Sequence, residues 1–372
     1  MKKKVFFITG SRAEYGQFSY FLSKLSKQKD ITLHIVVTGM HLYKKFGLTY
    51  KEILKEQHKI FKKINLENDN DKILSQPLSI SIGLNKFSKL FTKEKPAIVC
   101  IPCDRYEMLA PSLACHFLNI PIVHFYGGET SLGSIDNIHR DMISIMSKYH
   151  LISHNLHQKK LVNLGISKNK IFNIGILAED KIKRTKILKK NVLEKFLNFK
   201  IDNHTILLTY HPVANNLNTT IKEIDNILRA LLRLNRFKII FTKPNNDYGH
   251  SQIIKRISKF VKDNPKKSIL VDSLGQQKYY SLIKYVRFVS GNSSSLLYEV
   301  PLFKKISLNI GIRQLGRTRN HSVINSKANI KDIENKMIII DKKITNFKNF
   351  KNIFFKKNPT DLALKVIRLA CK

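Results

Sequence analysis

The chain has 372 residues, of which 43% are hydrophobic and 25% charged. That length exceeds what one hydrophobic core usually serves, and the composition is typical of a folded protein and excludes a disordered one. No apolar run approaches the roughly 20 residues of a membrane-spanning helix. The basic start of the chain lacks the apolar length and the small-residue cleavage site of a signal peptide. We therefore expect two globular domains and no membrane partner.

The net charge of +39 is extreme and raises the question of an anionic partner. Nucleic-acid binding is one interpretation, because basic surfaces attract phosphate backbones. However, the 66 lysines and arginines are spread along the whole chain, and no recognised nucleic-acid motif is present. We therefore expect no dedicated nucleic-acid partner, but an anionic substrate is favoured.

The four cysteines are too few for a disulfide framework in a chain of this length, which favours a reducing cytoplasm. Cys100 and Cys103 match the C-x-x-C spacing of redox pairs and half metal sites. Because no second ligand pair is visible, we expect neither a metal nor a redox cofactor.

Short apolar runs alternate with helical patterns through the first half of the chain. This alternation predicts a doubly wound parallel sheet. The polar, lysine-rich residues 48–75 are expected to cover the surface. The expected strands are 5–8, 32–39, 97–100, 120–124, 149–153 and 171–175, and the expected helices include 79–91, 106–118 (bent at Pro111) and 156–164.

The second half repeats the pattern, which predicts a second Rossmann-like domain. A cleft between two such domains is a common place for a ligand. Beyond residue 317 we expect only a lysine-rich linker and one helix over 361–371. The expected strands are 205–210, 237–242, 268–271, 286–290 and 306–310, and the expected helices are 219–234, 253–261, 277–285 and 296–300.

Acidic residues follow two neighbouring strands of the first half. Asp104 and Glu129 come directly after these strands, and Asp136 and Arg140 lie four residues apart at a helix start. Open α/β sheets bind ligands at the carboxyl ends of their strands, where grouped carboxylates can perform acid–base chemistry. The alternative is structural: Asp104 pairs with Arg105 or Arg140, and Asp136 caps a helix.

Groups suited to anions follow the strands of both halves. Arg12 stands in the small-residue turn before a helix, and the turn over 291–295 offers hydroxyls and amides at another helix start. Glu299 could accept hydrogen bonds from sugar hydroxyls or be an ordinary surface residue. His211 could donate to a phosphate or be a strand-end histidine without a role. Together these groups favour a nucleotide sugar whose diphosphate binds the second domain.

Ten segments in order along the chain resemble the hydrolysing UDP-N-acetylglucosamine 2-epimerases, in particular the branch of sialic- and legionaminic-acid synthesis. They span nearly the whole sequence at sensible spacing, which makes the set specific. The segments are ITGSRAEYG (8–16), VTGMHL (37–42), FGLTYKEI (46–53), DRYEMLA (104–110), GGE (127–129), IFNIG (171–175), TYHPV (209–213), FTKPNND (241–247), GNSSS (291–295) and NIGIRQLGR (309–317).

The resemblance implies the GT-B architecture of two Rossmann-like domains. Its expected boundaries are 1–178 for the acid–base domain, 179–358 for the UDP-binding domain, and 359–372 for a helix that packs back on the first domain. The implied reaction eliminates UDP from UDP-N-acetylglucosamine, or from a related diacetamido sugar nucleotide. Hydration of the resulting glycal would then release the 2-epimer, such as N-acetylmannosamine. No cofactor is implied, and a homodimer is one expected assembly.

The resemblance also assigns roles to individual residues. The expected catalytic residues are Asp104, Asp136, Glu129 and Tyr126. The expected substrate-binding residues are Arg12, Arg140, His211, Asn246, Ser273, Ser293, Ser294, Glu299 and Arg313.

Four positions depart from the family pattern. Cys103 replaces a glycine, Tyr126 replaces a glutamate or histidine, Asp141 replaces a histidine, and Ile312 replaces an acid. Tyrosine is a poor base at neutral pH. A nucleotide-sugar-binding homologue with lost or altered catalysis is therefore the alternative. A GT-B glycosyltransferase is a further one.

Overall fold

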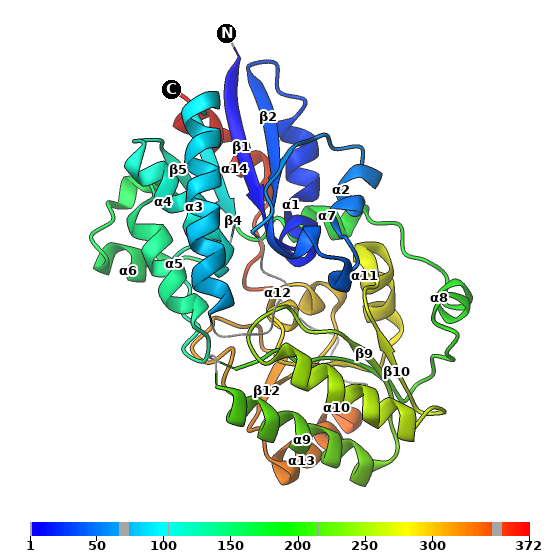
Figure 1. The fold of residues 1–372 in the computed structure, drawn as a ribbon. Coiled ribbons are helices and arrows are strands. Elements are labelled where there is room, and N and C mark those ends of the chain that lie inside the picture. The colour runs from blue at the N-terminus through cyan, green and yellow to red at the C-terminus, as the bar shows by residue number, and fades with distance from the viewer. Residues whose placement is uncertain (1, 67–73, 103, 214–215, 344–351) are drawn as a thin grey trace. The chain divides into compact units, whose positions relative to one another are not determined.

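The computed structural model of the chain describes residues 2–66, 74–102, 104–213, 216–343 and 352–372, so Cys103 lies outside the described residues. The chain divides into two compact units. Unit 1 comprises Met1–Thr130, Ile135–Lys183 and Phe354–Lys372, and unit 2 comprises Ser131–Ser134 and Arg184–Ile353 (Figure 1). Each unit contains one sheet with helices packed against it.

The sheet of unit 1 has seven parallel strands in the order β3-β2-β1-β4-β5-β6-β7. This order contains the 3-2-1-4-5-6 arrangement of the Rossmann fold, in which crossover helices cover both faces. The strands are β1 (Lys3–Thr9), β2 (Ile31–Val37), β3 (Ile60–Lys63), β4 (Ile98–Pro102), β5 (Ile122–Phe125), β6 (Tyr149–Ile152) and β7 (Ile171–Asn173).

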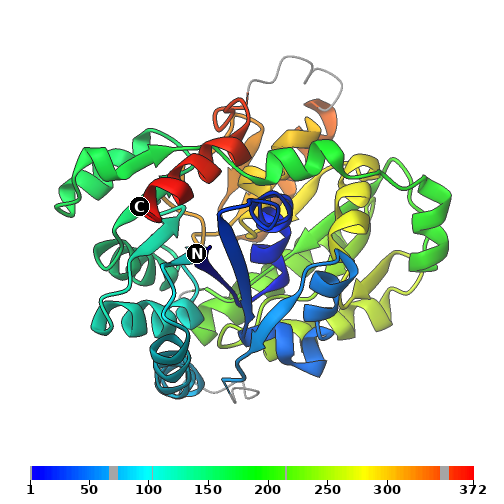
Figure 2. The ribbon, with the colours of Figure 1, turned by 90° about the horizontal axis from the view of Figure 1, so that it is seen from above.

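The central strand β1 is buried on both faces because its side chains alternate between two hydrophobic cores. Val5 and Phe7 join one core, and Phe6 and Ile8 join the other. Full burial of each large side chain contributes about 2 kcal/mol. The first core includes helix α14 (Pro359–Ala370), the red helix of Figure 2, which contacts α1 (Arg12–Leu25) and β6. The end of the chain therefore completes a core that its beginning starts.

The other helices of unit 1 include α4, which begins after a 3₁₀ turn, Tyr106–Met108. Pro111 lies in the first turn of this helix, where its missing N–H leaves no hydrogen bond unmade. The helix therefore continues past Pro111 to Phe117, and the expected bend stays a prediction. The helices are α2 (Tyr50–Lys55), α3 (Ser75–Glu94), α4 (Leu109–Phe117), α5 (Asp136–Ile145), α6 (Leu156–Asn163) and α7 (Ala178–Arg184).

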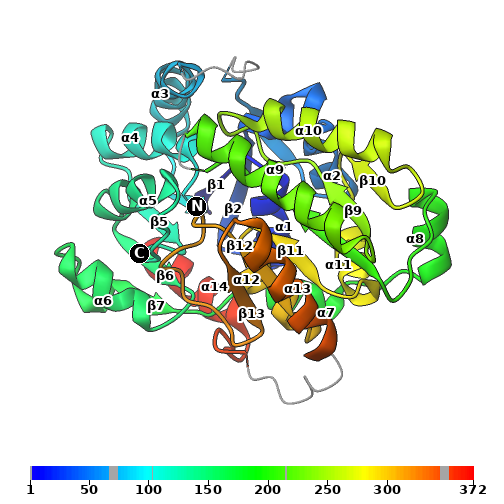
Figure 3. The same cartoon turned by 90° about the horizontal axis from the view of Figure 1, so that it is seen from below.

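The sheet of unit 2 has six parallel strands in the order β10-β9-β8-β11-β12-β13. Helices α9, α10 and α13 lie together on one face (Figure 3) and share one core with it. The strands are β8 (Thr205–Thr209), β9 (Lys238–Thr242), β10 (Ser268–Val271), β11 (Val289–Gly291), β12 (Ser307–Ile310) and β13 (Val323–Ser326). The helices are α8 (Lys190–Leu197), α9 (Leu217–Leu234), α10 (His250–Asp263), α11 (Gly275–Tyr285), α12 (Ser295–Tyr298) and α13 (Ile330–Lys343).

The two-domain parallel α/β fold expected from the sequence is confirmed, but one expectation about its edges is wrong. The stretch 48–75, which was expected to cover the surface, contains α2 and the largely exposed edge strand β3, which pairs with β2. The expected linker after residue 317 contains β13 and α13. These elements lack a strong apolar pattern for two reasons. Edge strands carry polar residues where one face is solvated. Helix α13 buries a narrow stripe formed by Ile333, Met337 and Ile340.

The turn that ends β11 depends on Gly291. A methyl group on this residue would lie 1.8 Å from the backbone oxygen of Thr209, and φ is +126°. We expect Gly291→Ala to lower the free energy of unfolding by at least about 3 kcal/mol in urea titrations. Gly165→Ala is the matched control, because Gly165 also has positive φ but nothing within 4 Å. It should cost only about 1 kcal/mol, and equal losses would show that the collision with Thr209 is unimportant.

Candidate active site

The acidic edge of unit 1 is organised by the buried guanidinium of Arg140, whose side chain is 1% exposed. Its Nη2 donates to Oδ2 of Asp104, and its Nη1 donates to the backbone oxygen of Glu129 at 3.0 Å. Arg140 thereby joins the turn after β4 to the turn after β5. A buried ion pair depends on complete hydrogen bonding, because each ion has lost its hydration. The structural alternative for Asp104 is thus realised with Arg140, and Asp104 still lies at the predicted edge of the sheet.

Glu129 is buried at the same edge and its carboxylate is held by the chain. Its Oε1 accepts a hydrogen bond from the Ser153 hydroxyl at 2.9 Å. Lys160 donates to the backbone oxygen of Glu129 at 3.2 Å and pairs with Asp141 at 2.7 Å. Asp141, one of the departures from the family pattern, is therefore paired with a lysine beside the Glu129 turn.

Asp136 is the first residue of α5 and is partly exposed. The N-cap position belongs to Ile135, so the expectation of a capping aspartate is off by one residue. Its Oδ1 lies 3.8 Å from Nδ1 of His139. A carboxylate in the first turn is stabilised by the helix dipole. Asp136 and Arg140 are thus presented by the same short helix.

The side chain of Tyr126 packs against other residues of unit 1. Its backbone is left-handed, with φ of +63°, and its hydroxyl oxygen accepts a hydrogen bond from the Leu177 N–H at 2.9 Å. Its ring is buried and stacks at a tilt on Phe18, 5.6 Å between ring centres. Left-handed backbone is unusual for a residue other than glycine and marks a constrained position. The catalytic role of Tyr126 stays a prediction.

Glu14 is a buried acid that was not among the predicted site residues. Glu14 completes a capping box with Ser11 at the start of α1, and its Oε2 accepts from the Gly10 N–H at 2.9 Å. Burial, and then the nearby Glu107, raise the pKa of Glu14 to about 7, although Arg105 opposes this shift. The S-x-x-E spacing of residues 11–14 is the signal that could have identified it.

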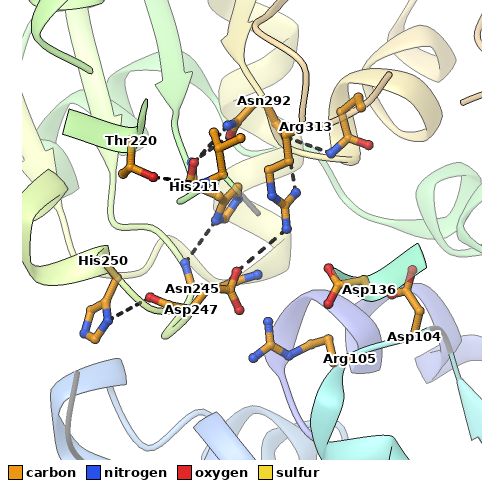
Figure 4. Close-up of polar contacts among 12 residues, drawn as sticks. Asp104, Arg105, Asp136, His211, Thr220, Asn245, Asp247, His250, Asn292 and Arg313 are labelled. Carbon is orange, nitrogen blue, oxygen red and sulfur yellow. Dashed lines mark hydrogen bonds and ion pairs between the residues drawn. The ribbon is translucent and has the colours of Figure 1, made fainter. Parts of the chain in front are cut away.

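In unit 2, His211 is fixed by Asn292 and Asn245 (Figure 4). The Asn292 side chain accepts from the backbone N–H of His211 at 2.7 Å and donates to its backbone oxygen at 2.9 Å. The N–H of Asn245 donates to Nδ1 of His211 at 3.0 Å. Because a backbone N–H can only donate, the proton of the neutral imidazole must lie on Nε2. His211 is therefore set to donate through Nε2, as phosphate binding would require.

Arg313 extends the same network of unit 2. Its Nη1 donates to the backbone oxygen of Asn292 at 3.3 Å, and its Nη2 lies 3.7 Å from Oδ2 of Asp247. Gln314 donates to the same Asn292 oxygen at 2.8 Å. Asn292, Gln314 and Asp247 were not among the predicted site residues, and asparagine and glutamine carry no sequence signal that separates such supports from surface residues.

The remaining predicted binding residues lie at strand ends, except Glu299. Glu299 follows α12 and accepts from the Tyr280 hydroxyl at 2.8 Å. The others are Arg12 at the start of α1, Asn246 after β9, Ser273 after β10, and Ser293 and Ser294 between β11 and α12. Their binding roles stay predictions. Across the described residues, no three or more metal-binding side chains are grouped to hold a metal ion, and no helix there is long and apolar enough to cross a membrane.

Two Rossmann-type units with polar strand ends define a protein of the GT-B class. Solved structures support this fold. The UDP-GlcNAc 2-epimerase of Neisseria meningitidis bound to UDP-GlcNAc has a TM-score of 0.82 at 17% identity and covers 98% of this chain and 100% of that one. The Methanocaldococcus jannaschii UDP-GlcNAc 2-epimerase in complex with UDP-GlcNAc and UDP also has a TM-score of 0.82, at 19% identity, covering 98% and 99%.

The chain belongs to the UDP-N-acetylglucosamine 2-epimerase family, whose profile matches residues 23–368. It is 42% identical to the GDP/UDP-N,N'-diacetylbacillosamine 2-epimerase (hydrolyzing) of Campylobacter jejuni, covering 88% of this chain and 85% of that protein. It is 33% identical to the UDP-N,N'-diacetylbacillosamine 2-epimerase (hydrolyzing) of Legionella pneumophila, covering 87% and 85%. The family resemblance of the motifs is thereby confirmed.

Removing the Arg140 guanidinium should be far more damaging than removing the whole ion pair. We expect Arg140→Met to lower the free energy of unfolding by about 3–5 kcal/mol, because the buried Asp104 would lose the guanidinium that pairs with it. The double variant Asp104→Asn/Arg140→Met should recover much of this loss in urea titrations. Additive losses in the double-mutant cycle would contradict the coupling that the contact indicates.

Proposed function

We propose that the protein is a hydrolysing 2-epimerase of UDP-linked 2-acetamido sugars. The observation that carries this proposal is that the two units of this chain, which belongs to the family, present different kinds of side chain at their strand ends. Unit 1 gathers Asp104, Glu129 and Asp136 at its strand ends, and unit 2 gathers His211 and Arg313. Carboxylates suit proton transfer at carbon, whereas the cationic and N–H donors suit a diphosphate.

The reaction needs removal of the C2 proton while the bond between C1 and the diphosphate oxygen breaks. The products of this elimination are UDP and a 1,2-unsaturated glycal. Water then supplies the hydroxyl group at C1, and a proton returns to C2 on the opposite face. Asp104 and Asp136 are the proposed acid–base carboxylates, and Glu129 is a further candidate. His211 and Arg313 would stabilise the negative charge on the leaving diphosphate.

A diacetamido sugar is the preferred substrate in this proposal. Two hydrolysing relatives at 42% and 33% identity are named for N,N'-diacetylbacillosamine. The Neisseria meningitidis relative named UDP-N-acetylglucosamine 2-epimerase is 29% identical. We therefore expect turnover of the UDP-diacetamido sugar to exceed that of UDP-N-acetylglucosamine, whose product would be N-acetylmannosamine.

Product identification by NMR tests the reaction. The purified chain, incubated with each UDP-sugar in D₂O, should release UDP and the free 2-epimer carrying deuterium at C2. A glycosyltransferase acting on water would release the sugar without inversion or deuterium at C2. Absence of turnover with both sugars, in a preparation that binds UDP, would overturn the epimerase assignment.

Asp104→Asn should separate binding from chemistry. Because the amide cannot accept a proton as the carboxylate does, we expect kcat to fall at least about 100-fold. The affinity for UDP, measured by calorimetry, should stay within about twofold. Equal losses of kcat and UDP affinity would instead indicate that Asp104 acts only by stabilising the fold. The control is Glu94→Gln, which changes an acid that is paired with Lys4.

A binding protein with lost catalysis is the second candidate, and the placement of Tyr126 favours it. The Tyr126 hydroxyl oxygen accepts a hydrogen bond from the Leu177 N–H, and tyrosine is a poorer base than the glutamate or histidine of the family pattern. If the wild-type chain binds UDP without turnover, Tyr126→His or Tyr126→Glu should restore activity under this alternative. Tyr126→Phe is the control that removes only the hydroxyl.

A further inference from the structure

A buried cluster of two acids and one arginine lies beside the turn that carries Asp104. Arg105 donates from Nε to both carboxylate oxygens of Glu107, at 3.2 and 3.1 Å, and from Nη2 to Oε1 at 2.9 Å. Glu107 is 0% exposed and Arg105 is 6% exposed. Such a multiply bonded pair fixes the guanidinium geometrically. The pair of Arg105 and Glu107 therefore anchors the backbone between Asp104 and the 3₁₀ turn Tyr106–Met108.

Glu14 joins this cluster from the start of α1. Its Oε2 accepts from the N–H groups of Gly10 and Ser11 at 2.9 and 3.2 Å. A methyl group on Gly10 would lie 3.6 Å from Oε2 of Glu14 and 3.8 Å from Cβ of Glu107, so the two acids flank one glycine. Oε1 of Glu14 is buried and has no hydrogen-bond partner among the described residues. Both Arg105 and Glu107 lie close enough to Glu14 to shift the pKa of its carboxyl group, Glu107 upward and Arg105 downward.

The turn after β2 closes on the same cluster. Gly39 has φ of +55°, and a methyl group there would lie 2.9 Å from Oε1 of Glu107 and 3.0 Å from the backbone oxygen of Gly10. The ends of β1, β2 and β4 therefore meet at the Glu107 carboxylate. These are strand ends of the edge at which ligands bind in open α/β sheets.

We infer that Glu107 and Glu14 are positioning residues for the proposed reaction: Glu107 holds Arg105 and so the Asp104 turn, and Glu14 controls this hold through its own charge. The inference rests on the proposed function, since it assigns Asp104 to catalysis. When Glu14 is neutral, it does not disturb the ion pair between Arg105 and Glu107. Ionised Glu14 adds a second negative charge beside Arg105, which weakens the pair that anchors the turn.

Glu14 is surrounded by charged and titratable neighbours. The arginines Arg105 and Arg12 are close in sequence to the strand ends of this cluster, and Glu107 accepts three hydrogen bonds from Arg105. Burial lowers the pKa of His41, whose N–H contacts the Gly10 turn, to about 3. The pKa of Glu14 itself is raised to about 7 by burial and by Glu107. Because the pKa of Glu14 is higher in the folded protein than its ordinary value of 4.5, its contribution to the free energy of unfolding is fully present below about pH 4.5. This contribution declines as the pH rises to about 7.

The test compares Glu107→Gln, Glu14→Gln and the control Glu94→Gln with the wild-type protein. We expect Glu107→Gln to lower kcat at least tenfold, with KM and UDP affinity within twofold. The wild-type kcat should fall as pH rises through about 7, and Glu14→Gln should keep its low-pH value and flatten this profile. Wild-type kinetics in both variants would overturn the inference.

An activity-independent measurement separates this inference from the proposed function. The Nε–H NMR resonance of Arg105, assigned with Arg105→Lys, should shift with a midpoint near pH 7 in the wild-type protein and not in Glu14→Gln. If the wild-type protein turns over no UDP-sugar but this shift is present, the epimerase proposal fails and the coupling of Glu14 to Arg105 stands. A pH-independent resonance would overturn the coupling even in an active enzyme. Glu14→Gln also serves if Glu107→Gln does not fold, because it keeps the shape and the acceptor atom.

Discussion

The acidic edge of unit 1 depends on the burial of one guanidinium. Arg140 has lost nearly all contact with water, and its charge is matched by Asp104 and by the backbone oxygen of Glu129. A charge in this environment tolerates little displacement, because each lost contact removes part of the compensation for its lost hydration. The positions of two strand-end turns and one helix are thereby set by the same side chain, and the carboxylates gain a fixed geometry.

In unit 2 an asparagine supplies much of the support. Asn292 supports His211 through both backbone groups and supports Arg313 through its own carbonyl oxygen. Amide side chains satisfy donors and acceptors without the desolvation cost of an ion. The backbone of His211 and the guanidinium of Arg313 are therefore held by the same asparagine. Unit 1 fixes its acidic edge with a buried ion pair, whereas unit 2 combines amide hydrogen bonds with the ion pair of Arg313 and Asp247.

The sequence predicted most of the central strands, because buried parallel strands read as short apolar runs. It missed the edge strands β3 and β13, which are half-solvated, although the edge strands β7 and β10 were predicted, and it missed α13, whose three inward residues lie among lysines. Residues at strand ends could be predicted as a group, since the topology brings them to one side of the sheet. Supports such as Glu107 and Asn292 could not, because their spacing along the chain resembles that of ordinary surface residues.

The sequence by itself determined the family, the order of the strands' apolar runs and the residues placed after each strand. The tertiary structure decided which of those residues are ion-paired, buried or bonded to backbone. Asp104 and Arg140 are 36 residues apart, so their pairing depends on strand order. The Tyr126 hydroxyl meets Leu177 for the same reason. The local sequence pattern determines which side chains follow each strand. Long-range packing determines which groups surround each charged side chain, and these groups set its protonation and its hydrogen bonds.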